Sequence, residues 1–415
     1  MSIINREKLS ELPGNLWVAS ATSFLTDISS EMVLNILPLF MSSVLGIKTN
    51  IIGIIEGVAE ATSSLLKVFS GWLSDKLRSR KWMAVAGYGL SALSKPFFYF
   101  ANSWGAVAGV RWADRVGKGI RTAPRDALVA DNVKPEQRGL AFGLHRAADT
   151  AGAMLGILIA ALIVWRLQAG SARLAENTFR TVVLVSLIPA FLAVLVLAVG
   201  TKEVSIGGET HKVRISFKEL GRDFTLFMLI VGIFDVGNSS DAFLVLRAQE
   251  RGMSALNILL MLAAFNLIYT VVSTPAGALS DKLGRRKLII GGWIVYALIY
   301  LGFALARSAV HVGLLYAAYG FYYGMAYGTA KAMVADLVPA EMRGTAFGTY
   351  NAILGILDFP ASVIAGLLWS GAGAWKGFGP SAPFFFGAGM ALLAVVLFIF
   401  WKPTAPEKQS LPEQL

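Results

Sequence analysis

Two short motifs each occur twice in this chain, and the two copies of each lie about half a chain length apart. GWLSDKLRSRK at 71–81 returns as GALSDKLGRRK at 277–287. Likewise, ADNVKPEQRGLAFG at 130–143 returns as ADLVPAEMRGTAFG at 335–348. Two separate motifs repeated at nearly one interval indicate a duplicated unit. The fold must therefore combine two similar halves, and in membrane proteins such repeats enclose a transport path.

Composition places both halves in a lipid bilayer. Hydrophobic residues make up 55% of the chain and charged residues only 15%, whereas a soluble domain carries about 25% charged residues. The net charge of +11 comes from basic residues in short loops between apolar runs, which fits the positive-inside rule better than nucleic-acid binding. The absence of cysteine excludes disulfides and thiol chemistry.

Twelve apolar segments are each long enough to cross a bilayer as a helix, which takes about 20 residues. We predict an all-α membrane protein of two six-helix bundles, 1–200 and 222–402, related by a pseudo-two-fold axis. A polar cytoplasmic linker, 201–221, joins them, and a disordered cytoplasmic tail, 403–415, follows. An even number of spans puts both termini on one side, and the basic loops make that side the cytoplasm. The expected spans are 15–46, 50–73, 81–101, 104–130, 138–165, 178–200, 222–247, 254–279, 287–306, 309–336, 342–370 and 380–401.

The twelve spans and the repeated loops resemble the major facilitator superfamily. The loops match that family's motif between helices 2 and 3 and its echo between helices 8 and 9. The second copy, DKLGRR at 281–286, is close, whereas the first has Leu77-Arg78-Ser79 where a glycine usually stands. The resemblance implies a secondary transporter, not an enzyme, that works by alternating access around a site between its halves. It does not identify the solute.

The repeated motifs place acidic and basic residues where they could lock the cytoplasmic side. Asp75, Asp131 and Arg138 are expected to form one charge network. The alternative is that these are solvated surface charges, each contributing less than about 1 kcal/mol. The predicted gate comprises Gly71, Asp75, Asp131, Arg138, Asp281, Arg285, Asp336 and Arg343.

The fourth span has an unusually charged face. Its charges recur at steps of three or four residues, so they share one side of the helix, and Pro124 is expected to kink the helix near its cytoplasmic end. Each charge would cost several kcal/mol if it faced lipid, so this face must meet water, a ligand or opposite charges. By the resemblance, Arg111 matches the span-4 arginine of a second family motif. The charged residues are Arg111, Asp114, Arg115, Lys118, Arg121 and Arg125.

Acidic residues in other spans could carry protons or neutralise these cations. We predict proton coupling through Asp27, Glu31, Asp149 and Asp241, whereas Glu56 and Glu60 could equally be structural. We expect a secondary active transporter whose anionic or zwitterionic solute binds span 4 between the two halves. Two alternatives stay open. A proton-driven exporter of cationic or amphiphilic compounds could use the acids as its site, or the fold could sense a ligand without moving it. The predicted substrate-binding residues are Arg111, Asp114, Arg115, Lys118, Asn238, Tyr323, Tyr327 and Asn351.

The expected partners follow from this interpretation. They are a small-molecule substrate, protons as the coupling ion, and the lipid of an inner or plasma membrane, around a monomer that binds no nucleic acid. No nucleotide-binding fingerprint occurs, so no cofactor is expected. The three histidines, at 145, 211 and 311, are too scattered for a metal site.

Overall fold

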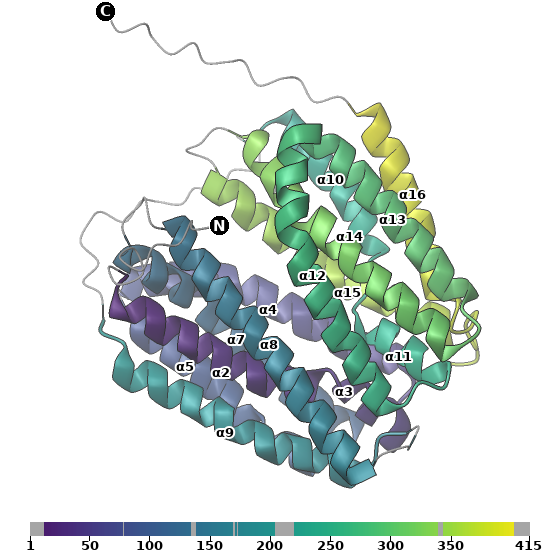
Figure 1. The fold of residues 1–415 in the computed structure, drawn as a ribbon, viewed down its shortest axis with the longest axis horizontal. Coiled ribbons are helices and arrows are strands. Elements are labelled where there is room, and N and C mark those ends of the chain that lie inside the picture. Colours follow the sequence, from purple (N-terminus) through teal and green to yellow (C-terminus); the bar gives the residue numbers. More distant parts are fainter. Residues whose placement is uncertain are drawn as a thin grey trace, which may run out of the picture.

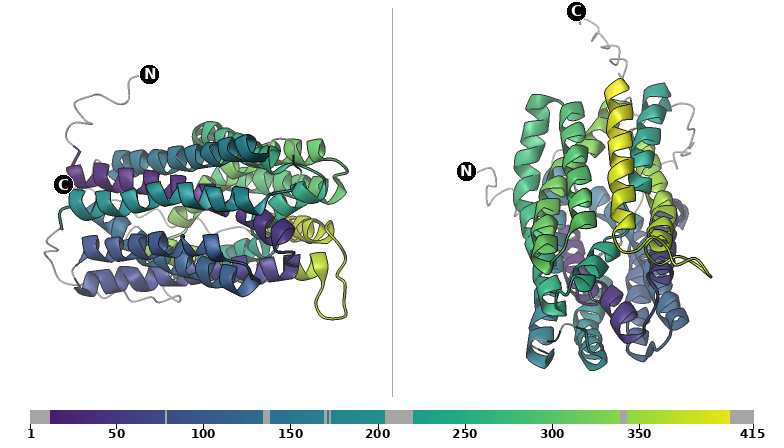
Figure 2. Two further views of the ribbon diagram at one scale, coloured as in Figure 1. Left: turned by 90° about the horizontal axis from the view of Figure 1, so that it is seen from below. Right: turned by 90° about the vertical axis from the view of Figure 1, so that its right-hand side faces the viewer.

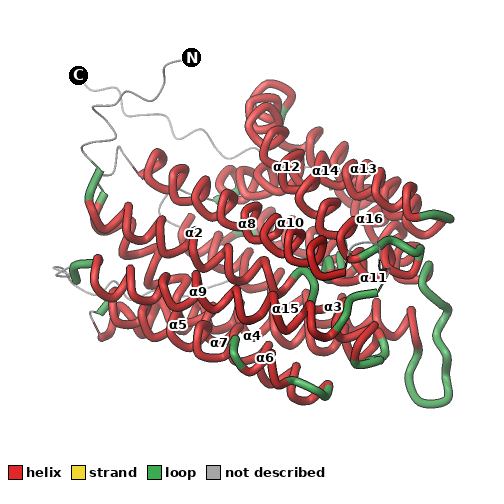
Figure 3. Tube along the Cα trace, turned by 60° about the horizontal axis from the view of Figure 1, so that its bottom comes forward, coloured by secondary structure: helices red, strands yellow, loops and turns green. Residues whose placement is uncertain are grey.

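The computed structural model describes residues 12–77, 79–133, 138–168, 171, 173–203, 220–338 and 343–401. Within these ranges the regular structure is helical, apart from one isolated bridge between Ala372 and Trp375, and short loops join the helices. The long helices stand side by side along the bundle, and short helices such as α3 (Leu37–Leu39) and α11 (Ala242–Glu250) lie near one end (Figures 1 and 2). The connections gather at the two ends of the bundle (Figure 3).

The helices of the first half map onto the first six expected spans. Helices α2, α3 and η1, the last a π-helix, make up span 1, and α5 and α6 make up span 3. The bounds are α2 (Gly14–Leu34), α3 (Leu37–Leu39), η1 (Phe40–Val44), α4 (Thr49–Leu77), α5 (Arg80–Ser94), α6 (Phe97–Phe100), α7 (Trp104–Asn132), α8 (Arg138–Gln168) and α9 (Glu176–Gly200).

The second half supplies the other six spans, with α10 and α11 together forming span 7. The all-α fold with twelve spans in two bundles is therefore confirmed. Most of the predicted linker (204–219) and the whole tail lie outside the described residues, so the domain boundaries stay a prediction. The bounds are α10 (Arg222–Val236), α11 (Ala242–Glu250), α12 (Ala255–Leu283), α13 (Arg285–Leu305), α14 (Ala309–Asp336), α15 (Arg343–Ser370) and α16 (Ala382–Phe400).

The outer surface of the helix bundle is apolar, as expected of a surface that contacts lipid. Seven helical segments are long and apolar enough to cross a membrane, and large apolar side chains such as Ile188, Val199 and Phe400 are exposed on the outside of the bundle. The strongly charged α7 is not among those seven described segments. Its charges are instead turned inward: Arg111, Arg115 and Arg121 are all buried.

Three spans that the sequence predicted as continuous are broken. Span 1 is interrupted after Leu34, span 3 at Lys95–Pro96, and span 7 between Val236 and Ala242. Proline explains the second break, because it lacks an N–H and crowds the preceding turn. The third follows from the glycine and short polar side chains of the segment GNSSD at 237–241, which compete for backbone hydrogen bonds. By contrast, α7 continues through Pro124.

The two halves pack tightly at the end opposite the repeated motifs. We call the end where α4 and α12 finish, at Leu77 and Leu283, the motif end. At the opposite end α4 and α15 approach so closely that a Cβ added at Gly57 would lie 3.0 Å from the Cα of Phe359. A Cβ at Gly366 would lie 2.7 Å from the Cα of Asn50. These helices therefore form a seam without space for larger side chains.

Hydrogen bonds between the halves reinforce this closure. The backbone N–H of Asn50 donates to Oγ of Ser370 at 2.9 Å, and its side-chain amide donates to the carbonyl oxygen of Gly371 at 2.8 Å. Ser42, in η1, donates to Oε1 of Gln249, in α11, at 2.7 Å. The interior between the halves is thus shut off at this end.

Candidate functional site

Two cavities lie between the halves, and one of them is nearer the motif end than the other. The central cavity, of about 400 Å³, lies near the breaks in spans 1 and 7. The motif-end cavity, of about 740 Å³, is lined by the parts of α2, α4, α7, α8, α12 and α15 nearer the motif end. Glu31 and Asn266 line both cavities, so these two residues lie where the cavities adjoin.

The broken spans 1 and 7 contribute corresponding segments to the central cavity. Leu34, Asn35 and Pro38 line it from the first half, and residues 238–242 line it from the second. The backbone N–H of Ser240 donates to Oγ of Ser362 at 3.3 Å. Interrupted helices in matching positions of two repeats mark the binding sites of many transporters. The sequence signal was present in SSE at 29–31 and SSD at 239–241, although no break was predicted there.

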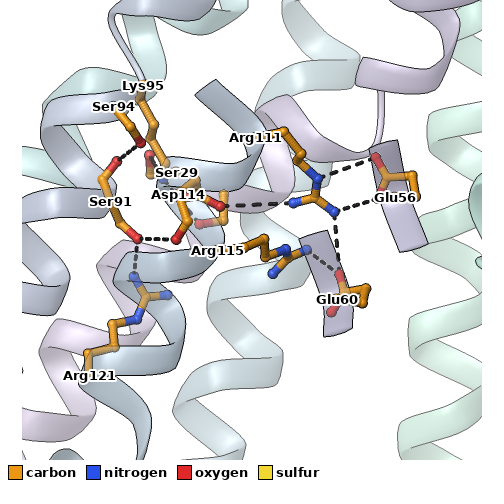
Figure 4. A network of polar contacts seen from close by, with 11 residues as sticks. Ser29, Glu56, Glu60, Ser91, Ser94, Lys95, Arg111, Asp114, Arg115 and Arg121 are labelled. Carbon is orange, nitrogen blue, oxygen red and sulfur yellow. Dashed lines mark hydrogen bonds and ion pairs between the residues drawn. The ribbon is translucent and has the colours of Figure 1, made fainter. Parts of the chain in front are cut away.

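One side of the central cavity is a set of ion pairs between α7 and α4, which we call the arginine wall (Figure 4). Arg111 donates to both carboxylate oxygens of Glu56, through Nε at 3.3 Å and Nη2 at 2.6 Å. Arg115 Nη2 lies 2.7 Å from Oε1 of Glu60, which also lies 3.4 Å from Arg111 Nη2. Both guanidinium charges are therefore neutralised by the neighbouring helix. Glu56 and Glu60 are their counter-ions at the cavity surface.

A second polar layer lies behind the arginine wall. Asp114 is buried, and among the described residues it is absent from the lining of both cavities. Its Oδ2 lies 3.9 Å from Nη1 of Arg111. Lys95, which sequence reasoning missed, donates from Nζ to Oγ of Ser29 at 2.6 Å and of Ser30 at 3.1 Å. A Lys-Pro pair inside an apolar run was the signal that could have found it.

A second part of the lining of the central cavity, which we call the carboxylate wall, comes from the second half. It presents Asp241 and Asp358 beside the rings of Phe265, Tyr316 and Tyr323. The hydroxyl of Tyr319 donates to Oδ1 of Asp241 at 3.4 Å. Among the described residues that line the cavity, the second half supplies no cation. The carboxylate wall thus carries negative charge with aromatic faces around it.

The motif-end cavity collects the remaining predicted acids of the first half. Asp27, Glu31 and Asp149 line it, so three predicted proton carriers share one space. Oδ1 of Asp149 lies 3.8 Å from Nε2 of His145. Basic residues lie among these acids, which makes the cavity nearly balanced in charge. They are Lys67, Lys118, Arg121, Arg125 and Arg146.

The predicted substrate residues therefore divide between the two spaces. Arg111, Arg115, Asn238 and Tyr323 line the central cavity, where the predicted proton carrier Asp241 also lies. Lys118 and Asn351 line the motif-end cavity instead. The side chain of Tyr327 lies outside the described residues. One face of α7 therefore serves two different cavities.

At the motif end, the described residues of each half include an ion pair between the two repeated motifs. Arg80 Nε lies 3.3 Å from Oδ2 of Asp131, and Arg285 Nε lies 3.3 Å from Oδ2 of Asp336. Arg80 corresponds to Arg286 in the repeat, so the second copy uses the neighbouring arginine. Arg286 instead donates to the carbonyl oxygens of Phe398 and Ile399.

The rest of the predicted gate is only partly described. Gly71 packs beside Ala123, whose Cβ would be 3.4 Å from an added Cβ. The side chains of Asp75, Arg138, Asp281 and Arg343 lie outside the described residues. The expected contact between Asp75 and Arg138 therefore stays a prediction.

Comparison with known proteins decides the family. The model of the Major Facilitator Superfamily matches residues 19–359 and 242–415. The chain belongs to this superfamily. It is therefore an integral membrane transporter, not an enzyme, and it binds a small-molecule substrate.

Individual relatives of this superfamily member agree with that assignment. An uncharacterized MFS-type transporter of Methanocaldococcus jannaschii is 36% identical over 402 residues, which cover 95% of this chain and 97% of the relative. A multi-drug resistance efflux pump homolog of Lactococcus lactis is 24% identical over 381 residues, covering 88% and 91%. A solved bacterial homolog of the human lysosomal transporter Spinster, inward-facing and occupied, has a TM-score of 0.76 at 14% identity, covering 94% and 98%.

Proposed function

We propose that this transporter is a proton-driven exporter of organic cations that carry an amine or ammonium group. The observation that carries the proposal is the pairing of Arg111 and Arg115 with Glu56 and Glu60. Because these cations are already neutralised, they act as internal counter-ions. An anionic or zwitterionic solute would have to displace a carboxylate from each arginine.

The charge of the central cavity supports a cationic substrate. The described residues of its lining include five carboxyl groups and two guanidinium groups. A cleft with an excess of one charge concentrates ligands of the opposite charge. Phe265, Tyr316 and Tyr323 add ring faces that attract cations. The multi-drug resistance efflux pump homolog of Lactococcus lactis supports export as the direction of transport.

Proton coupling follows from competition for the same carboxylates. A carboxyl group that holds a proton no longer attracts a cation, so substrate and proton exclude each other at Asp241 and Glu31. Glu31 lies where the two cavities adjoin, and its Oε2 accepts a hydrogen bond from the amide of Asn35 at 2.8 Å. Asp27 and Asp149 extend the path from Glu31 through the motif-end cavity. Exchange of protons for substrate would then drive export.

The orientation in the membrane follows from the basic loops. We place the motif end, both termini and the linker in the cytoplasm of a cell with an inner or plasma membrane. The seam between α4 and α15 then closes the outer side, and the described conformation faces inward. The solved Spinster homolog, with which this chain shares its fold, is also inward-facing. We take the working unit to be a monomer.

The test is transport by purified protein in liposomes with an acidic lumen. We expect tetraethylammonium to accumulate in the lumen, whereas the dianion terephthalate does not. Glu31→Gln should abolish accumulation driven by the pH gradient but retain exchange of labelled for unlabelled cation. The matched control is Glu176→Gln, because Glu176 is an exposed acid paired with Arg180.

Two results would overturn the proposal, and a third would correct its path for protons. Transport of terephthalate alone would favour an anionic substrate and return Arg111 and Arg115 to the role of ligands. Binding of the cation without transport under any gradient would favour a ligand sensor. Accumulation by Glu31→Gln equal to that of the unchanged protein would remove Glu31 from proton coupling.

A further inference from the structure

A small side pocket opens beside the central cavity, inside the second half. Its volume is about 90 Å³, and Asn238 and Tyr323 line both spaces. Asn238 is held by the hydroxyl of Tyr296, which donates to its Oδ1 at 3.2 Å. The side pocket therefore adjoins the central cavity at the break of span 7, where Asn238 lies.

A buried carboxylate faces the interior of the side pocket. Asp235 lines the pocket, and only 7% of its surface is exposed. Its oxygen Oδ2 is buried and has no hydrogen-bond partner among the described residues. Burying a carboxylate oxygen without a hydrogen bond is costly, so this oxygen can accept a positive group or a proton.

Aromatic rings form most of the remaining surface. Phe234 stacks on Trp293 with ring centroids 4.9 Å apart, and Tyr322 meets Tyr323 edge-on at 5.6 Å. Tyr350 completes the ring set, and its side chain is also buried. Five aromatic side chains around one carboxylate are the arrangement that recognises alkylated ammonium groups.

We propose that the side pocket binds the alkylated ammonium head of the transported cation while the rest of the solute occupies the central cavity. This inference rests on the proposed function and narrows its substrate class. The aromatic faces contact the alkyl groups and Asp235 supplies the charge. A primary amine fits this pocket less well, because its N–H groups would find too few acceptors among the rings.

The same residues do not suit a metal ion. Hard cations require several oxygen ligands, and the pocket offers Asp235 and Asn238 within a largely aromatic surface. No group of three or more potential metal-binding residues was found among the described residues. An organic cation is therefore the better occupant.

The test compares three small probes by calorimetry on the purified full chain. Choline carries a trimethylammonium head, ethanolamine carries an unalkylated one, and dimethylbutanol replaces the nitrogen of choline with carbon. We expect choline to bind at least about tenfold more tightly than either of the others. Asp235→Asn, which preserves shape, should remove that preference by weakening choline at least about tenfold.

Two further variants separate the side pocket from the central cavity. Trp293→Phe should weaken choline by about threefold, because tryptophan is the strongest cation–π partner; it also tests the pocket if Asp235→Asn does not fold. Asp241→Asn, in the central cavity, should weaken choline and ethanolamine by the same factor and leave their ratio intact.

Two outcomes would count against the inference in different ways. If the ratio of choline to ethanolamine affinity is unchanged in Asp235→Asn and Trp293→Phe while tetraethylammonium is still transported, the side pocket is not the ammonium site and the proposed function stands. If the unchanged protein binds neither choline nor tetraethylammonium, the proposed function fails and this inference fails with it.

Discussion

On the arginine wall of the central cavity every guanidinium group has a carboxylate within 3.4 Å, whereas the carboxylate wall from the second half holds Asp241 and Asp358 among aromatic rings. The arginine wall has more charged residues than the carboxylate wall, but its ion pairs leave it closer to neutral. The carboxylate wall is nearly apolar in sequence but carries the uncompensated charge. A count of charges along one helix is therefore a poor guide to what a cavity binds, because the neighbouring helix can cancel them.

The largest effect should come from breaking the arginine wall. Glu56→Gln leaves the buried charge of Arg111 without its closest partner, and removing one member of a buried pair costs about 3–5 kcal/mol. Thermal unfolding in detergent should show this loss. The double variant Glu56→Gln, Arg111→Gln should recover most of it. Equal stability of the single variant and the unchanged protein would mean that the pair is not structural.

A smaller effect on stability and a large effect on binding should come from the carboxylate wall. Asp241→Asn removes charge but keeps shape, so we expect the fold to persist while tetraethylammonium binding weakens by about 2–5 kcal/mol. Calorimetry on the purified protein measures this, with Glu176→Gln as the control. Unchanged affinity would show that the two walls do not differ in function.

Substitutions of Arg115 test whether the arginine wall contacts the ligand. Arg115→Ala should not weaken tetraethylammonium binding, because Arg115 pairs with Glu60 and the freed carboxylate adds negative charge to the cavity. Arg115→Lys should lie between the alanine variant and the unchanged protein. If the cavity instead holds an anion, the alanine variant should lose about 2–5 kcal/mol of terephthalate binding.

The smallest effect should be at the motif end, where the two halves again differ. The side chains of Arg285 and Asp336 are 29% and 54% exposed, against 10% and 36% for Arg80 and Asp131. Arg285→Ala should therefore cost less than about 1 kcal/mol of unfolding free energy, and Arg80→Ala should cost more. The same thermal assay ranks them, and the reverse order would contradict the ranking by burial.

The twelve spans could be predicted from the sequence, because a helix that crosses a bilayer needs a long apolar run and such runs are visible in the sequence. It did not predict the breaks in spans 1, 3 and 7, since hydrophobicity alone does not register the loss of a few backbone hydrogen bonds. Periodicity placed Arg111 and Arg115 on one face of α7. It could not show that α4 turns Glu56 and Glu60 toward them, because the rotation of a neighbouring helix depends on packing in three dimensions.

The same limit explains the residues that were missed or misplaced. Asp114 shares the face of Arg111 in a helical projection, yet it lies behind the cavity surface. Lys95 and Asp235 are single charges in apolar runs, and their surroundings come from segments far away in sequence. The aromatic neighbours of Asp235, for example, come from α10, α13, α14 and α15.

The seam between α4 and α15 has a consequence for the pace of transport. Gly57 and Gly366 allow the two backbones to touch, so opening the far side means separating a long line of close contacts at once. Partial opening is unfavourable, because a narrow gap loses van der Waals contacts before lipid or water can fill it. Separation of this seam should therefore limit the turnover rate, although it lies far from the charged residues of the cavities. A bulkier residue at Gly57 would weaken these contacts. The turnover rate should then rise while the substrate specificity stays the same.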